Sequence, residues 1–153
     1  MINQIGAYSL YICLFVSVYL ILKSYISSKN FDKKIDQTFF ATLSVQLFMT
    51  ILSFFTLVFA FVFSDFSNIT VFNNSHTLKP LFYKISGTWG NHEGSLLLWL
   101  LVLTFFLFIF FVTSKKMSLR YRILTILFQE IIILGFLLFI LFTSNPFLNI
   151  LPI

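Results

Sequence analysis

Charged residues are scarce in this sequence, at 10% of 153 residues, whereas an average soluble domain has about 25%. Hydrophobic residues make up 59% of the chain, and its mean hydropathy is +0.98. A chain this short cannot bury so much apolar surface inside one soluble core. Lipid must therefore be its solvent, and we predict an integral membrane protein.

The residues that most catalytic sites need are also scarce. The single Cys13 excludes a disulfide, a CxxC redox pair and a multi-thiolate metal site within the chain. We find no phosphate-binding glycine loop, no Ser-His-Asp pattern and no carboxylate pair at acid–base spacing. The net charge of +5 comes from basic clusters beside apolar runs, which excludes a nucleic-acid stripe. We expect no complete catalytic centre in this chain.

Apolar residues form four long runs, at positions 5–22, 39–63, 96–112 and 123–142. At about 1.5 Å rise per residue, each run approaches the ~30 Å thickness of a hydrocarbon core. Backbone groups inside a bilayer have no water to bond, so each run should be an α-helix. The predicted fold is an all-α membrane bundle of four transmembrane helices, forming one domain over residues 1–153.

Basic residues predict how the helices are oriented. Eight of the ten lie in the first and third connections, at Lys23, Lys29, Lys33, Lys34, Lys115, Lys116, Arg120 and Arg122. The positive-inside rule places both connections on the inner side of the membrane. We therefore expect Asn30 and Lys116 inside, and both termini, Asn74 and the polar loop 64–95 outside.

The outer loop ends in the strongest motif of the chain, which leads into the third apolar run: Gly87-Thr88-Trp89-Gly90-Asn91-His92-Glu93-Gly94-Ser95. Helical spacing would place Trp89, His92, Leu96 and Trp99 near one face. Such an aromatic face, with one imidazole at the membrane surface, can stack a planar macrocycle that His92 ligates or hydrogen-bonds.

A purely structural interpretation of the motif is also open. Tryptophan is an ordinary anchor at membrane interfaces. Gly90 and Gly94 form a small-xxx-small pair that would let another helix approach, while Asn91 and Glu93 favour a helix N-terminus. His92-Glu93 is not a zinc protease motif, because no second histidine follows at the required spacing. The remaining histidine, His76, has no potential co-ligand nearby in sequence.

Two polar residues, Gln129 and Glu130, interrupt the fourth apolar run. A carboxylate inside a membrane is costly enough to be paired or protonated, and it is a functional-site candidate by default. Hydrogen bonding between helices explains the pair equally well, so we retain both interpretations.

Taken together, several segments resemble the N-terminal part of CcmF, the cytochrome c haem lyase component. They are residues 64–66, 74–75, 80–84, 89–99 and the Ser144-Asn145-Pro146-Phe147 segment. The resemblance implies that haem, delivered by a chaperone, becomes attached to apocytochrome c on the outer side of the membrane. It also places the Trp-rich haem-binding loop and the haem-ligating histidines of the family beyond the part represented here.

The resemblance implies one piece of a split CcmF, an arrangement known in mitochondria. Haem would then be held mainly by partner chains and not by this chain alone. The expected partners are the remaining CcmF polypeptides, the haem-delivery chaperone, apocytochrome c and the lipid bilayer. The expected location is the mitochondrial inner membrane with loop 64–95 facing the intermembrane space, or otherwise a bacterial inner membrane. The alternative function is a structural or accessory subunit of a respiratory complex.

Overall fold

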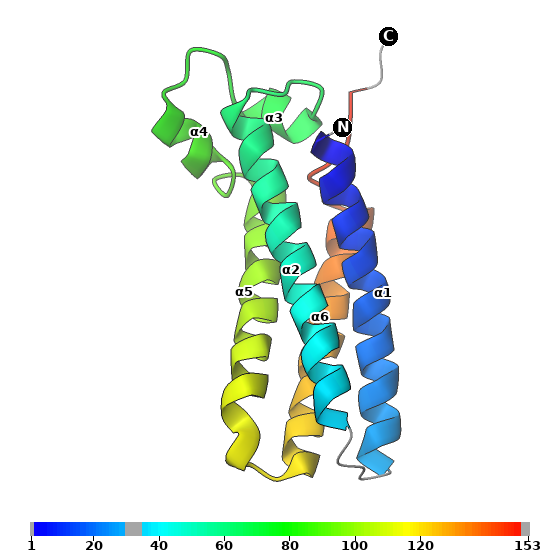
Figure 1. Ribbon diagram of the computed structural model, residues 1–153. Helices are drawn as coiled ribbons and strands as arrows, with labels where there is room; N and C mark the ends of the chain where they lie inside the picture. The colour runs from blue at the N-terminus through cyan, green and yellow to red at the C-terminus, as the bar shows by residue number, and fades with distance from the viewer. Residues whose placement is uncertain (1, 30–34, 151–153) are drawn as a thin grey trace.

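The computed structural model describes residues 2–29 and 35–150, and within them every element is helical (Figure 1). Four of these helices are long and apolar enough to cross a membrane: α1 (Ile2–Lys29), α2 (Ile35–Val62), α5 (His92–Thr113) and α6 (Leu119–Phe142). The short elements are α3 (Ile69–Asn74), α4 (Leu81–Gly87) and the 3-10 turn η1 (Ser114–Lys116). The predicted all-α membrane fold is confirmed.

The long helices form a ring in which α1 packs against α2 and α6, and α5 completes the ring between the same two helices. Each helix buries one stripe whose members recur every three or four residues, which is the spacing of left-handed helix bundles. On α5 the stripe is Leu97, Leu100, Thr104, Leu107 and Phe111; on α6 it is Ile123, Ile126, Glu130, Ile133, Leu137 and Ile140.

Small and polar residues are frequent in the stripes of α1 and α2. On α1, Cys13, Ser17 and Ser24 are fully buried, and on α2 Gln46, Thr50 and Ser53 are buried. Such residues suit a membrane bundle because apolar side chains gain little by leaving lipid, whereas small side chains allow close approach and polar ones bond across helices. Small and polar residues therefore mark the inward faces of α1 and α2, whereas those of α5 and α6 are mainly Leu, Ile and Phe.

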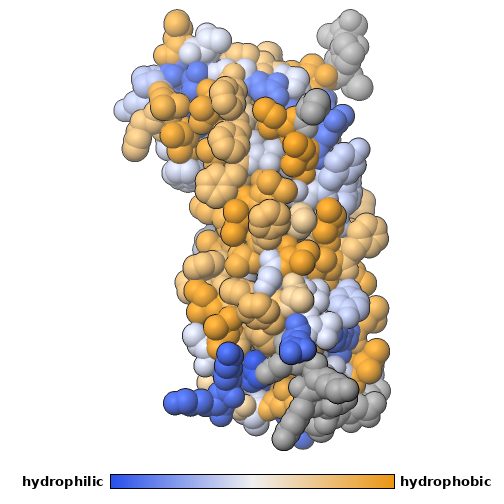
Figure 2. Space-filling model, viewed as in Figure 1, coloured by the Kyte–Doolittle hydropathy of each residue, from blue (hydrophilic) through white to orange (hydrophobic). Residues whose placement is uncertain are grey.

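The two ends of the bundle differ in structure. One end carries the start of α1, the helices α3 and α4, and residues 143–150 (Figure 1). We call this end the outer cap, following the predicted topology. The opposite end carries the end of α1, the start of α2 and η1; Asn30, Lys33 and Lys34 lie outside the described residues. An apolar belt separates two more polar ends (Figure 2).

Arg122 closes the inner end of the bundle although it is 5% exposed. Its guanidinium donates to the Phe111 carbonyl at 3.2 Å and to Ser114 Oγ at 3.1 Å, and it lies 4.8 Å from the centre of the Phe111 ring. Carbonyls at a helix C-terminus lack partners within their helix and attract cations. Arg122 therefore joins the end of α5 to the beginning of α6.

The helices extend beyond the apolar runs that predicted them. Helix α5 begins at His92 instead of position 96, because Asn91 caps it, and α6 begins at Leu119 instead of 123, because Ser118 caps it. Polar capping residues start a helix before its sequence becomes apolar. Loop 64–95 is correspondingly more ordered than expected, since it contains α3, α4 and the first turn of α5.

Candidate functional site

The Gly87–Ser95 motif forms the turn that leads from α4 into α5, and Asn91 is its centre. Asn91 Oδ1 accepts from the Gly94 N–H at 2.7 Å, which caps the first turn of α5. Its Nδ2 donates to the carbonyls of Gly87 at 2.8 Å and Thr88 at 3.1 Å. One side chain thus satisfies backbone groups on both sides of the turn.

Gly94 is required by the same turn. A Cβ atom built at this position would clash with the carbonyl oxygen of Thr88 and approach Asn91 Oδ1 to 3.2 Å. The helix of Gly94 therefore packs against the backbone of its own preceding turn. The expectation that Gly90 and Gly94 form a docking pair for another helix is wrong for Gly94, because the chain itself fills that space, and Gly90 precedes the helix.

The aromatic side chains of the motif are not needed by this turn and point outward. Trp89 is 41% exposed, His92 is exposed, and Trp99 is 59% exposed. The prediction that Trp89 shares a helical face with His92 and Trp99 is wrong, because α5 begins at His92 and Trp89 lies in the turn before the cap. His92 and Trp99 remain two turns apart on α5, about 10 Å along its axis.

Two further motif residues, Glu93 and Ser95, stabilise the first turn of α5. Glu93 is half-buried in the first turn of α5, where a carboxylate interacts favourably with the helix dipole. Ser95 is also half-buried, and its hydroxyl donates to the His92 carbonyl at 2.9 Å. Both contribute to the helix start, so the exposed chemistry of the motif resides in Trp89 and His92.

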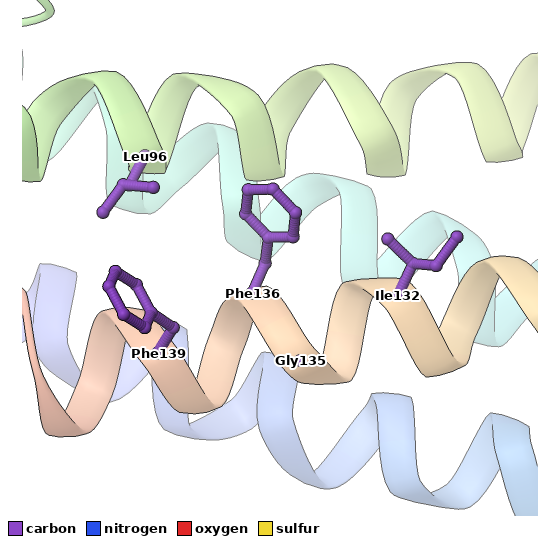
Figure 3. A pocket seen from close by; sticks show the side chains of 5 residues that line it. All are labelled: Leu96, Ile132, Gly135, Phe136 and Phe139. Carbon is purple, nitrogen blue, oxygen red and sulfur yellow. The ribbon is translucent and has the colours of Figure 1, made fainter.

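The His92 ring faces α6, where its centre lies 6.4 Å from that of Phe139 in an edge-to-face arrangement. Below this contact an apolar groove of about 380 Å³ opens between α5 and α6 (Figure 3). Its walls are Leu96 from α5 and Ile132, Gly135, Phe136 and Phe139 from α6. One imidazole therefore stands at the outer mouth of an apolar groove.

A network of asparagines holds the outer cap together. The buried Asn68 donates through Nδ2 to Asn3 Oδ1 at 3.0 Å and to the Pro146 carbonyl at 2.8 Å. Asn3 donates to Asn149 Oδ1 at 2.9 Å, and the Ile69 N–H donates to the Leu148 carbonyl at 2.9 Å. The start of α1, the start of α3 and the segment after α6 are thereby joined, an arrangement that our reading of the sequence missed.

Helix α4 is attached to the end of α2 through Ser64. Ser64 adopts a left-handed φ of 53°, and the N–H groups of Ser64 and Asp65 return to the carbonyls of Phe61 and Ala60. This pattern is a Schellman helix ending, in which glycine is usual. The Ser64 hydroxyl is placed to accept from Lys84 Nζ at 2.7 Å, so the ending of α2 also positions the helix that precedes the motif.

Glu130 lies at the centre of the bundle with no exposed surface. Its Oε2 accepts from Ser17 Oγ of α1 at 2.8 Å and from Gln46 Nε2 of α2 at 3.0 Å, while Oε1 has no partner within the described residues. The carboxylate therefore links three helices of this chain. For Glu130, the hydrogen bonding between helices considered from the sequence is present, and it lies within this bundle.

Gln129 occupies a different face of α6. It lies in a second depression between α5 and α6, of about 200 Å³, together with Phe106, Leu107, Phe110 and Thr125. No hydrogen bond of its amide is found in the part of the chain that the structure describes. The two adjacent polar residues thus differ: Glu130 is bonded inside the bundle, and Gln129 faces the seam between two helices.

The described residues contain no group of three or more His, Cys, Asp or Glu side chains that could hold a metal ion. The second histidine, His76, is exposed in the α3–α4 connection. This end of the bundle therefore offers two separate exposed imidazoles, His76 and His92, and exposed aromatic rings to a planar apolar ligand, but little that would enclose one.

Comparison with known proteins reveals bacterial relatives. The chain is 41% identical over 152 residues to the cytochrome c-type biogenesis protein CycK of Bradyrhizobium diazoefficiens, an alignment that covers 98% of this chain and 23% of CycK. It is 35% identical over 159 residues to CcmF of Haemophilus influenzae, covering 99% of this chain and 24% of that protein. It is 44% identical to CcmF of Escherichia coli over 107 residues, which are 69% of this chain and 16% of that CcmF.

The fold also matches a solved structure, described as cytochrome c heme lyase CcmF, with a TM-score of 0.88 and 21% identity. The match covers 96% of this chain and 25% of the solved chain. No family model matches the sequence. The chain thus spans less than a quarter of the length of its CycK and CcmF relatives.

Proposed function

The chain belongs to the CcmF family of cytochrome c-type biogenesis proteins, and from this premise we propose that it forms one membrane module of a haem lyase assembly that attaches haem to apocytochrome c. The observation that carries the proposal is the exposure of Trp89 and His92 in a motif whose turn is built by other residues. Exposed aromatic and imidazole groups on a rigid cap are typical of a binding surface.

In this proposal haem is the substrate and is held mainly by the rest of the assembly. His92 would ligate or hydrogen-bond one side of the haem, and Trp89 would contact its face or edge. Stable haem binding in a protein usually uses a protein axial ligand in a shaped pocket, and the residues that complete such a pocket would come from the rest of the assembly.

The remaining partners follow from the same proposal. They are the other CcmF segments, on the same or a separate polypeptide, a haem-delivery chaperone and apocytochrome c. We propose the mitochondrial inner membrane as the location, with the outer cap facing the intermembrane space, because the basic connections favour the matrix side. In a bacterium the equivalent location would be the inner membrane.

Substituting His92 or Trp89 by alanine should reduce mature cytochrome c by about tenfold or more at equal membrane abundance, equivalent to ~1.4 kcal/mol of lost transition-state binding. Both side chains are exposed, so the melting temperature of the purified chain should not change. Maturation is measured by haem staining of cytochrome c.

The outer cap supplies matched controls for both substitutions. His76→Ala removes another exposed histidine, and Phe72→Ala removes an aromatic side chain that is 59% exposed; neither should affect maturation. Normal cytochrome c levels in both His92→Ala and Trp89→Ala would reduce the motif to packing and favour the accessory-subunit alternative.

The orientation is tested by labelling single cysteines in a Cys13→Ala background. Asn74→Cys on the outer cap should react with a membrane-impermeant maleimide in intact vesicles or mitoplasts, and Lys116→Cys should react only after the membrane is opened. Both positions are exposed, so failure to react reports sidedness and not burial. The reverse pattern would invert the proposed topology.

A further inference from the structure

The seam between α5 and α6 has two features that this chain does not explain. The first is Gly135, where an added Cβ would meet no atom within 4 Å. The chain's own packing therefore does not require glycine there, although glycine inside a helix costs about 1 kcal/mol relative to alanine. Glycine on an outward helix face is typical of positions where another membrane helix approaches closely.

The second feature is the amide of Gln129, which has no hydrogen-bond partner among residues 2–29 and 35–150. Gln129 lines the second depression between α5 and α6, of about 200 Å³, where its surroundings are mainly apolar, namely Phe106, Leu107 and Phe110. An amide without partners in an apolar medium costs several kcal/mol, or about 1–3 by protein mutational data. Bonding to a polar side chain of a neighbouring helix would remove that cost.

Gln129 and Gly135 lie close enough for one occupant to reach both. They are six residues apart on α6, about 9 Å of helix rise and about 120° of rotation around its axis, and each lines a depression between α5 and α6. The outer depression lies beside Ile132 and Phe139 and is almost wholly apolar (Figure 3). A rod-shaped occupant along the seam would therefore make apolar contacts in the depression at Gly135, nearer the outer cap, and a hydrogen bond to Gln129, further from it.

We propose that the α5–α6 seam is the docking surface for a transmembrane helix from the rest of the CcmF-type assembly. This helix would pack closely at Gly135 and present a hydrogen-bonding side chain to Gln129. The inference rests on the proposed function for the identity of the assembly. This chain matches 23% of CycK and 24% of CcmF from Haemophilus influenzae. The unmatched part of each relative is therefore more than three times as long as the matched part, and an equivalent of it could supply the helix.

A lipid acyl chain is the competing occupant, and the chemistry argues against it. An acyl chain can fill the outer depression, but it has no donor or acceptor for the amide of Gln129. A transmembrane helix satisfies its own backbone and can still offer a side chain. Open space at Gly135, together with a Gln129 amide that has no partner among the described residues, therefore favours a helix.

The test is photo-crosslinking in native membranes from a benzoylphenylalanine residue placed at Ile132, which lines the outer depression. We expect adducts whose mass-spectrometric peptides map to an apolar segment of a CcmF-family polypeptide, the same chain or another. Gly135→Phe should lower the adduct yield by about tenfold, which is ~1.4 kcal/mol of binding, and Gln129→Leu should lower it too. Lipid adducts alone, or an unchanged yield in both variants, would overturn the proposal.

Leu138→Phe is the matched control, since it adds bulk on α6 at an exposed position outside both depressions. Its yield should equal that of the unmodified chain, and neither it nor Gly135→Phe should change the melting temperature. Comparing this crosslinking result with cytochrome c maturation in a strain that lacks the chain separates the two proposals. If the deletion strain loses maturation but the chain gives no crosslink, only the docking surface is refuted. If the chain gives the crosslink but the deletion strain matures cytochrome c normally, only the function is refuted.

Discussion

Gly94→Ala should unfold the turn at the start of α5 and lower the cytochrome c maturation that we propose for the outer cap. The new methyl group would clash with the Thr88 carbonyl oxygen, and a backbone atom cannot move aside as a flexible side chain can. The hydrogen bond from the Gly94 N–H to Asn91 would break as the helix shifts. Overpacking of this kind costs about 3 kcal/mol, measured as a fall in the melting temperature of the purified chain.

Two other glycines serve as matched controls for this substitution. Gly135→Ala meets no atom within 4 Å and should stabilise the isolated chain slightly, by up to about 1 kcal/mol, because alanine favours helix. Gly90→Ala would approach the Ser86 carbonyl at 3.3 Å, a contact that a small shift relieves. If Gly94→Ala is no less stable than Gly90→Ala, Gly94 does not pack against the Thr88 carbonyl.

Substitutions of the exposed and of the buried residues of the motif should then have different effects on stability and on cytochrome c maturation. Gly94→Ala should lower both stability and cytochrome c maturation, whereas His92→Ala should lower maturation alone. This difference follows from their positions, since Gly94 is buried against Thr88 and His92 is exposed near Phe139. A motif that contains both kinds of residue cannot be interpreted by scanning it for loss of activity without a stability measurement.

The sequence predicts the four long helices because the apolar runs exceed what any soluble element needs and the bilayer permits only helix. It does not predict which face of each helix points inward, because lipid and the protein core are equally apolar. The spacing of small and polar residues is the signal that was available, for example Cys13, Ser17 and Ser24 on α1, all of which are buried.

Local chemistry at the outer cap was less predictable. The Asn91 cap follows from residue type alone, but the collision at Gly94 depends on the path of the preceding turn. The bonds between Asn3, Asn68 and Asn149 join segments up to 146 residues apart, and no local pattern in the sequence links them. Gly135 was overlooked because a single glycine in an apolar run has no partner at small-xxx-small spacing.

Glu130→Ala should destabilise the bundle by about 2–4 kcal/mol, because it removes the only acceptor found for the Gln46 amide and leaves the Ser17 hydroxyl just the backbone carbonyl of residue 130, at 3.3 Å, within the described residues. The expected cost exceeds that of a typical interhelical hydrogen bond, about 0.6 kcal/mol, since two donors and a cavity are involved. The free energy of unfolding can be measured by SDS titration of the chain in mixed micelles.

A second substitution at Glu130, and one at the adjacent Gln129, show whether hydrogen bonding or charge gives Glu130 its role. Glu130→Gln retains a carbonyl oxygen that can accept from Ser17 and Gln46, and its new NH2 would replace Oε1, which has no partner in the described part of the chain. It should therefore cost less than about 1 kcal/mol, and Gln129→Ala should change the stability of the isolated chain by no more than about 0.5 kcal/mol. If Glu130→Gln is as damaging as Glu130→Ala, the ionised carboxylate itself is required. If Glu130→Gln instead leaves stability intact but abolishes cytochrome c maturation, Glu130 is a functional residue of the lyase and its bonds to α1 and α2 serve to position it.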